Sequence, residues 1–131
     1  MNEESFLDVN TDDAKEPIAV SAGEYEIRII GGEISTDKNG HDYFLPRFEV
    51  ANEPNAKDFT DFIGLPHDEM DEKETARAKW KLEAFKRCFG VVGSKVKPSE
   101  TIGLTGWAIL RVKEDPEWGE QNKISKYILP K

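Results

Sequence analysis

The stretch TARAKWKLEAFKRCFG, residues 75 to 90, lies between two groups of strand-like segments and decides which fold the sequence predicts. At ~100° per residue its apolar residues share one helix face, as expected for a helix packed on a core. These residues are Ala78, Leu82, Phe85 and Phe89. Asp71 followed by Glu74 resembles a capping box, and Gly90 is a common helix end. The sequence therefore predicts one helix between Asp71 and Gly90.

Period-two alternation of apolar and charged residues predicts a strand over residues 23 to 35, GEYEIRIIGGEIS. Its Gly31-Gly32 pair predicts a bulge or bend rather than the end of the strand. Asn39-Gly40 predicts a hairpin turn into a second strand, about Tyr43 to Val50. Pro46 lacks an N–H, so we expect it at an edge or bulged position of that strand.

A third strand is predicted at about residues 58 to 63, a fourth at about 105 to 113, and a fifth in NKISKYIL. Three strands, one helix and two strands is the layout of an OB-fold, a partly open barrel with its helix between strands three and four. The predicted class is therefore mainly β (α+β), a five-stranded OB-like barrel with one helix. A sheet covered on one side by the helix fits the same order.

Charge divides the chain into a flexible acidic arm, residues 1–17, and an OB-like domain, residues 18–131. The arm has six acidic residues and one lysine, a net charge of -5 out of -8 for the whole chain. Phe6, Leu7 and Val9 form a short apolar patch in it that could join a sheet edge or touch a partner. Residues 73–97 carry a local charge of +6, which could hold an anionic partner or form a solvated helix face.

Cysteine content and hydropathy predict a cytoplasmic protein without membrane association. The single Cys88 cannot form an internal disulfide, and we expect it to be a small buried hydrophobe in a reducing compartment. No apolar run is long enough to span a bilayer, and the start MNEESFLDVN is acidic where a signal peptide is basic.

The sequence offers little to catalysis, and we expect a protein that is not an enzyme and binds no cofactor or metal. It lacks paired metal-binding histidines or cysteines, a nucleophile elbow and a phosphate-cradling glycine loop. His67, Asp68 and Glu69 are consecutive and cannot all point into one site from a regular element. We therefore favour a solvated loop there over a metal site.

Binding of single-stranded nucleic acid fits the sequence better, because cations can follow phosphates while aromatic faces stack on bases. In an OB-fold, strands two and three and the loops joining strands one-two and four-five form the binding surface. The candidate nucleic-acid-binding residues are Arg28, Lys38, Tyr43, Arg47, Phe59, Arg111, Lys113, Trp118 and Lys123. Tyr43 could equally be a surface strand residue, and Trp118 could cap the barrel mouth. We expect Trp107 in the core.

Trp80 lies roughly opposite the apolar face of the predicted helix, beside Arg77 and Arg87. It could be covered by the arm or by residues 91–103, form a cation-π contact, or touch a partner. We favour the first interpretation, because an OB-fold helix closes the barrel bottom, away from the binding groove.

Residues 18 to 131 resemble a group of small bacteriophage proteins that bind single-stranded DNA. The matching features are AGEYEIRI, DKNG before the second strand, a helix ending KRCFG, GLTGWAILRV, and a final strand entered through QNKISKYI. The resemblance implies an OB-like protein that coats single-stranded DNA during phage DNA replication or recombination in the host cytoplasm. Such proteins commonly carry an acidic C-terminal tail, whereas this chain ends YILPK and has its acidic arm at the other end.

If the arm acts as that tail does, it competes for the DNA groove and binds replication or recombination proteins once DNA displaces it. The rival function is a protein-interaction module, a phage factor that binds a host or replisome protein without nucleic acid. A DNA-mimicking inhibitor is a third, weaker reading, supported only by overall acidity. Whether RNA competes with DNA, and whether the chain is a monomer or a homodimer, is left open by the sequence.

Overall fold

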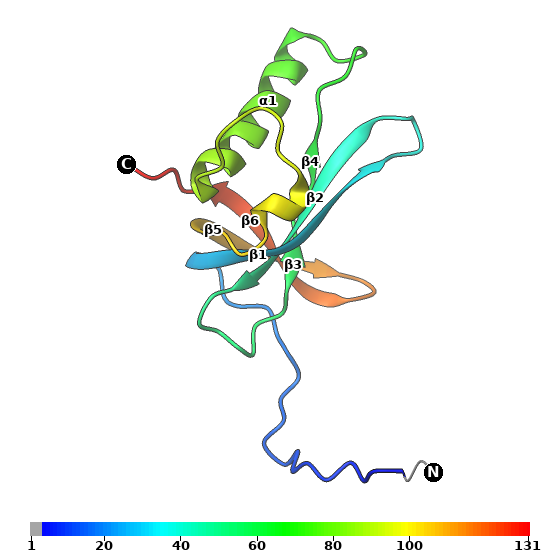
Figure 1. The fold of residues 1–131 in the computed structure, drawn as a ribbon, viewed down its shortest axis with the longest axis vertical. Helices are drawn as coiled ribbons and strands as arrows, with labels where there is room; N and C mark the ends of the chain where they lie inside the picture. The colour runs from blue at the N-terminus through cyan, green and yellow to red at the C-terminus, as the bar shows by residue number, and fades with distance from the viewer. Residues whose placement is uncertain (1–3) are drawn as a thin grey trace.

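An antiparallel sheet with one packed helix makes up the domain, and an extended N-terminal arm leaves it (Figure 1). This computed structural model describes residues 4–131, so the first three residues of the predicted arm, Glu3 included, lie outside the described part. The strands are β1 (Gly23–Thr36), β2 (Asp42–Val50), β3 (Phe59–Thr60), β4 (Ile63–Gly64), β5 (Thr105–Asp115) and β6 (Gly119–Tyr127). The helix α1 spans Glu72–Phe89, and a short 3-10 helix, η1, spans Pro98–Thr101.

The strand order is β3-β2-β1-β5-β6, with β4 pairing beside β3 on β2. The long β1 is central, because its residues 23–28 pair with β5 and its residues 27–36 pair with β2. The predicted mainly β class, with one helix between the early and late strands, is confirmed. The sheet is not closed into a barrel: β3 and β6 contact each other, but within residues 4–131 they form no ladder.

The predicted third strand is split in two, which gives six strands rather than five. Pro46 supplies the physical reason. The Pro46 carbonyl accepts the Asp61 N–H at 3.1 Å, so this side of Pro46 faces the third-strand region. Proline has no N–H to donate to that region in return. The ladder of β2 therefore runs to β4 before Pro46 and to β3 after it. The expected edge position of Pro46 is wrong, because β2 is internal and the interruption falls on its neighbour.

Local turn signals predicted the β1–β2 hairpin correctly. The register of β1 shifts between Ile29 and Gly31, which confirms the bulge. In the turn, the Asp37 carboxylate accepts the N–H groups of Asn39 and His41 at 2.8 and 3.0 Å, and Gly40 has φ 82°. These backbone hydrogen bonds lower the pKa of Asp37.

The helix also begins and ends as predicted. The Asp71 side chain accepts the Glu74 N–H at 2.8 Å, the Glu74 side chain accepts the Asp71 N–H, and Gly90 ends the helix in the left-handed conformation. Phe85 and Phe89 are buried against the sheet, and their rings pack with that of Phe48. A capped amphipathic helix thus covers the inner face of the sheet.

Cys88 is buried as predicted, and Trp107 is not. The Cys88 thiol donates to the Trp107 carbonyl at 3.3 Å, and its burial raises the thiol pKa to about 11. A Cβ at Gly106 would lie 2.7 Å from Cys88 Sγ, so the helix end rests directly on the backbone of Gly106. Since alternate residues of a strand face opposite sides, Gly106, Ala108 and Leu110 point inward and Trp107 points outward, 49% exposed.

Trp80 is 54% exposed, so the favoured prediction that the arm or residues 91–103 cover it is wrong. The Arg87 guanidinium carbon lies 5.7 Å from the centre of its ring, within cation-π range. The second interpretation is therefore the one that the structure bears out.

Residues 4–17 are exposed throughout and run away from the sheet (Figure 1). The chain joins the domain at Ile18, whose N–H donates to the Asn55 carbonyl at 3.0 Å. Two residues after Ile18, the backbone of Val20 is held by the buried Asn122 side chain, which donates to its carbonyl and accepts its N–H at 2.9 Å each. Between residues 4 and 131, no helix has the length and apolar character needed to cross a membrane.

Candidate nucleic-acid interface

An open groove of about 700 Å³ lies where the two ends of the sheet approach each other. Residues of β2, β3 and the segment before β3 form one wall, and the β5–β6 hairpin forms the other. Four predicted residues line the groove: Arg47, Phe59, Trp118 and Lys123. Lys57, Asp58 and, from the arm, Glu16 also line it. The β5–β6 loop thus meets β2 at one site.

The β5–β6 turn presents Trp118 to solvent. The Asp115 carboxylate accepts the N–H groups of Glu117 and Trp118 at 2.8 and 3.0 Å, and Gly119 has φ 74°. Those backbone hydrogen bonds lower the pKa of Asp115. Trp118 is 70% exposed, which does not suit the alternative role of a cap over the core.

Lys57 ties this turn to the opposite wall of the groove. Its ammonium group donates to the carbonyls of Trp118 and Glu120, at 3.0 Å each. Because both acceptors are backbone atoms, the tie fixes the turn without using the Trp118 ring. Lys57 was missed by sequence reasoning, since it lies in the turn-like ANEPNAK, and no periodic pattern singles it out.

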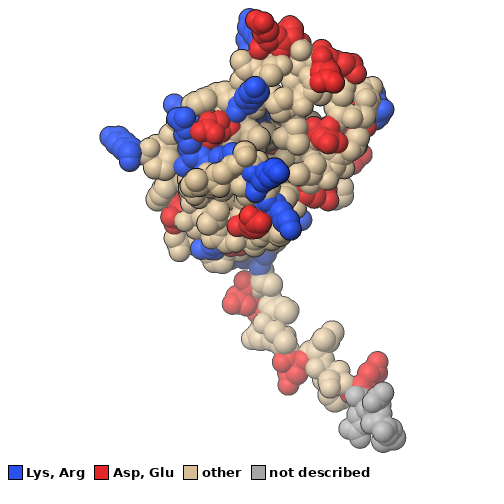
Figure 2. Space-filling view, turned by 45° about the horizontal axis from the view of Figure 1, so that its top comes forward, with Lys and Arg blue, Asp and Glu red and all other residues tan. Residues whose placement is uncertain are grey.

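Arg47 is exposed and faces the groove from β2. Its guanidinium lies 3.4 Å from the Asp58 carboxylate, and its neighbour in register on β1 is Gly31, which has no side chain to cover it. Exposed ion pairs of this kind contribute little to stability, so a phosphate can replace the carboxylate. The groove lining is charge-balanced, because Glu16, Asp58 and Glu117 offset Arg47, Lys57 and Lys123. Figure 2 shows that basic and acidic side chains both occur on one face of the domain.

The predicted stacking role of Phe59 is wrong. Phe59 pairs with Phe48 in register and shares its inward direction, so it is buried, with the two ring centres 5.4 Å apart. The exposed aromatic of this segment is Phe62, 52% exposed, which stacks on Tyr43 with ring centres 4.8 Å apart. Only the register of β3 against Phe48 distinguishes the two phenylalanines, and the sequence pattern does not contain it.

The remaining predicted residues do not line the groove. Arg28 forms a 2.5 Å ion pair with Glu49 on the outer side of β1 and β2. Lys38 lies in the β1–β2 turn, and Lys113 lies on β5 opposite Gln121. Arg111 does not line the groove either, but it lies next to it, directly opposite Lys123 in the β5–β6 ladder. The structure thus brings part of the predicted set together and spreads the rest along the outer surface.

The two histidines pair with each other in the loops beside the β1–β2 hairpin. Their rings stack with centres 3.6 Å apart, and His41 Nε2 lies 3.2 Å from the Glu69 carboxylate. His67 lies in the loop before α1, as expected. Across residues 4–131, no group of three or more His, Cys, Asp or Glu side chains could hold a metal ion.

Comparison with known proteins assigns no family. No protein-family model matches the sequence, and no curated protein matches it significantly. The interpretation of the groove therefore depends on its own geometry. It offers one exposed indole and three cations, and the half-buried Tyr43 stacks on the exposed Phe62 farther along β2.

Proposed function

We propose that the chain is a non-catalytic protein that binds single-stranded DNA in this groove, largely without regard to base sequence. One observation carries the proposal: the exposed indole of Trp118 and the cations of Arg47 and Lys123 line the same open groove. Single-stranded nucleic acid needs this combination, because bases stack on aromatic faces and the backbone is held by cations. The resemblance to phage single-stranded DNA-binding proteins extends the proposal to a role in phage DNA replication or recombination.

The outer surface of β2 can continue the path of a bound strand. Arg47 and Tyr43 are four residues apart and share one face of β2, which places them ~13 Å apart at about 3.3 Å per residue. The stacked Tyr43 and Phe62 rings would offer the next aromatic surface. A helix that reads duplex DNA must be free to enter the major groove, whereas α1 is packed on the sheet.

The test is a titration of intrinsic tryptophan fluorescence with a poly-dT strand and, separately, with a duplex of equal length. We expect the single strand alone to quench the signal. If Arg47, Lys57 and Lys123 each hold one phosphate, log affinity falls by about 2 per tenfold rise in salt, or roughly 18-fold between about 50 and 200 mM.

Absence of both quenching and a gel shift at low salt would refute the proposal. Salt dependence without quenching would instead indicate phosphate contacts that do not involve stacking. Replacing Trp118 with alanine in the same titration identifies the reporter.

A protein-interaction module is the second candidate, and the outer face of β5 favours it. Trp107 and Ile109 are 49% and 40% exposed there, side by side on alternate positions. Contiguous exposed apolar residues often mark a protein contact. Binding through this face would depend weakly on salt, which separates it from binding through phosphates.

A further inference from the structure

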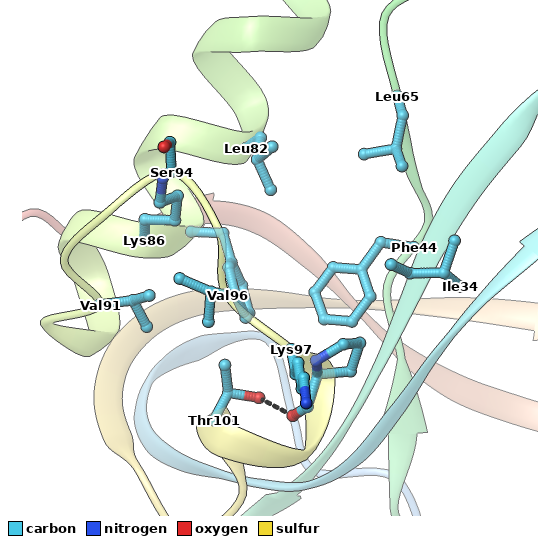
Figure 3. Close-up of a pocket in the computed structure, with 12 residues that line it drawn as sticks. Ile34, Phe44, Leu65, Leu82, Lys86, Val91, Ser94, Val96, Lys97 and Thr101 are labelled. Atoms are coloured by element: carbon cyan, nitrogen blue, oxygen red, sulfur yellow. Dashed lines mark hydrogen bonds between the residues drawn. The ribbon is translucent and has the colours of Figure 1, made fainter.

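A second cavity, of about 180 Å³, lies between α1, the loop that follows it, and the β1–β2 hairpin (Figure 3). Leu82, Val96 and Phe44 converge on it from these three elements. The Thr101 hydroxyl in its wall already donates to the Pro98 carbonyl at 2.7 Å, so its proton is not free for a polar ligand. The cavity shares no lining residue with the groove at Trp118. Its lining suits an apolar side chain.

The surroundings of this cavity are positively charged. Lys86 and Lys97 are among its lining residues, and neither forms an ion pair within residues 4–131. They belong to residues 73–97, which have eight basic and two acidic side chains. A ligand that matches this site would carry apolar groups beside carboxylates.

The chain's own arm has that chemistry. Phe6 and Leu7 are 92% and 100% exposed, although apolar side chains are stabilised by burial. Glu4 and Asp8 flank them, so two adjacent apolar side chains stand between two carboxylates. The segment and the cavity are therefore complementary in both apolar character and charge.

We propose that Phe6 and Leu7 of one copy insert into this cavity of a second copy, with Glu4 and Asp8 toward Lys86 and Lys97. The geometry favours a second copy over the same chain. The arm is anchored at Ile18 and runs away from α1, whose residues Leu82, Phe85 and Lys86 line the cavity (Figure 1). Leu7 lies eleven positions before Ile18, a span of ~40 Å at most when fully extended. The arm would have to fold back around the sheet to reach the cavity of its own chain.

Contact between the arm of one copy and the cavity of the next is heterologous, and such contacts build rings or open chains. The assembly forms without nucleic acid, so this inference does not depend on the proposed function. On a DNA strand it would align neighbouring copies.

Complementation between two defective variants tests the contact, in sedimentation experiments on the full chain without nucleic acid. The arm variant is Phe6→Ser with Leu7→Ser, and the cavity variant is Val96→Asp. We expect association of the wild type to increase with concentration and to be at least tenfold weaker in each variant alone. An equimolar mixture should form one-to-one dimers, because one chain keeps its cavity and the other its arm.

Matched controls separate docking from misfolding and from general attraction between charges. Val92 is 90% exposed in the same loop and does not line the cavity, so Val92→Asp should associate like the wild type. Lys97→Glu should weaken association and Lys95→Glu should not, since both exposed lysines lie in that loop but only Lys97 lines the cavity. Neither lysine is buried, so these variants test the contact even if Val96→Asp unfolds.

Three outcomes would overturn the proposal. A monomeric wild type would mean that the arm binds its own chain, a different protein, or nothing. Association unchanged by Phe6→Ser with Leu7→Ser would place the contact elsewhere. If Lys95→Glu weakened association as much as Lys97→Glu, the association would be a nonspecific attraction between charges.

Discussion

Replacing Trp118 with alanine isolates the stacking part of the proposed interaction. The residue is 70% exposed, and its turn is held by backbone hydrogen bonds to Asp115 and Lys57. None of those bonds uses the indole ring, so we expect the variant to fold with little loss of stability. Any loss of DNA affinity then reports the lost contact between the ring and a base.

The expected magnitude follows from one lost base–aromatic stack. Such a stack contributes ~1 to 3 kcal/mol, equivalent to a loss of about 5- to 150-fold in affinity. Trp107 provides a matched control, because it is 49% exposed and lies on the outer face of β5, away from the groove. We expect Trp107→Ala to change the affinity by less than about twofold, since it removes the same ring but no stack with DNA.

Anisotropy of a labelled poly-dT strand at low salt measures both affinities, and thermal unfolding verifies that both variants are folded. Equal affinity of Trp118→Ala and wild type would refute the assignment of the groove. A larger loss in Trp107→Ala than in Trp118→Ala would move the interface to the outer face of β5.

Three further predictions concern the arm, the packing of α1 and a buried hydroxyl. Deleting residues 1–17 should tighten binding of single-stranded DNA at low salt, because Glu16 lines the groove and the arm is strongly acidic. An unchanged affinity in the anisotropy assay would count against competition between the arm and DNA. Gly106→Ala should lower the free energy of unfolding in urea by ~1 to 3 kcal/mol, because its Cβ would clash with the end of α1. The control Gly31→Ala, whose nearest side-chain contact is 3.9 Å away, should be nearly neutral, and equal effects would contradict this account of packing. Burial raises the pKa of Tyr127 well above 10, and so does the Asp61 carboxylate, to which the hydroxyl donates at 2.6 Å. The contribution of the protonated, buried hydroxyl to folding stability is therefore complete below about pH 10, and it is lost as the pH rises through the folded-state pKa. The free energy of unfolding in urea should therefore fall less steeply with rising alkaline pH in Tyr127→Phe than in wild type. Parallel pH profiles would contradict the role given to the buried hydroxyl.

Elements defined by neighbouring residues were predictable from the sequence. The helix bounds follow from the capping box at Asp71 and from Gly90, and the hairpin turn follows from Asn39-Gly40. The bulge at Gly31 also lies in a short local pattern. In each case the residues that determine the structure are within a few positions of it, so no tertiary information is needed.

Which face a strand residue takes was less predictable, because a shift of one residue reverses every side chain of a strand. Trp107 was expected in the core and is exposed, and Phe59 was a candidate binding residue and is buried. The direction of Trp107 depends on the close approach of Cys88 to Gly106, and that of Phe59 depends on its pairing with Phe48. Both contacts join segments that are distant in the sequence.

The candidate site shows the same division. Trp118, Arg47 and Lys123 could be proposed from the expected fold, since the last hairpin and the second strand flank one surface in that layout. Lys57 and Glu16 could not, because nothing in their local sequence indicates that they reach the groove. The split of the predicted third strand likewise requires knowledge that Pro46 faces it.

The unclosed seam of the sheet explains why a groove exists at all. A continuous β3–β6 ladder would hold the strands about 4.8 Å apart and leave no room between them. Side chains join the two walls instead: Lys57 donates to the β5–β6 turn at one end of the seam, and Tyr127 donates to Asp61 at the other. These ties hold the walls together without filling the space between Arg47 and Trp118. The open seam between β3 and β6 is therefore the feature that makes the proposed binding groove available.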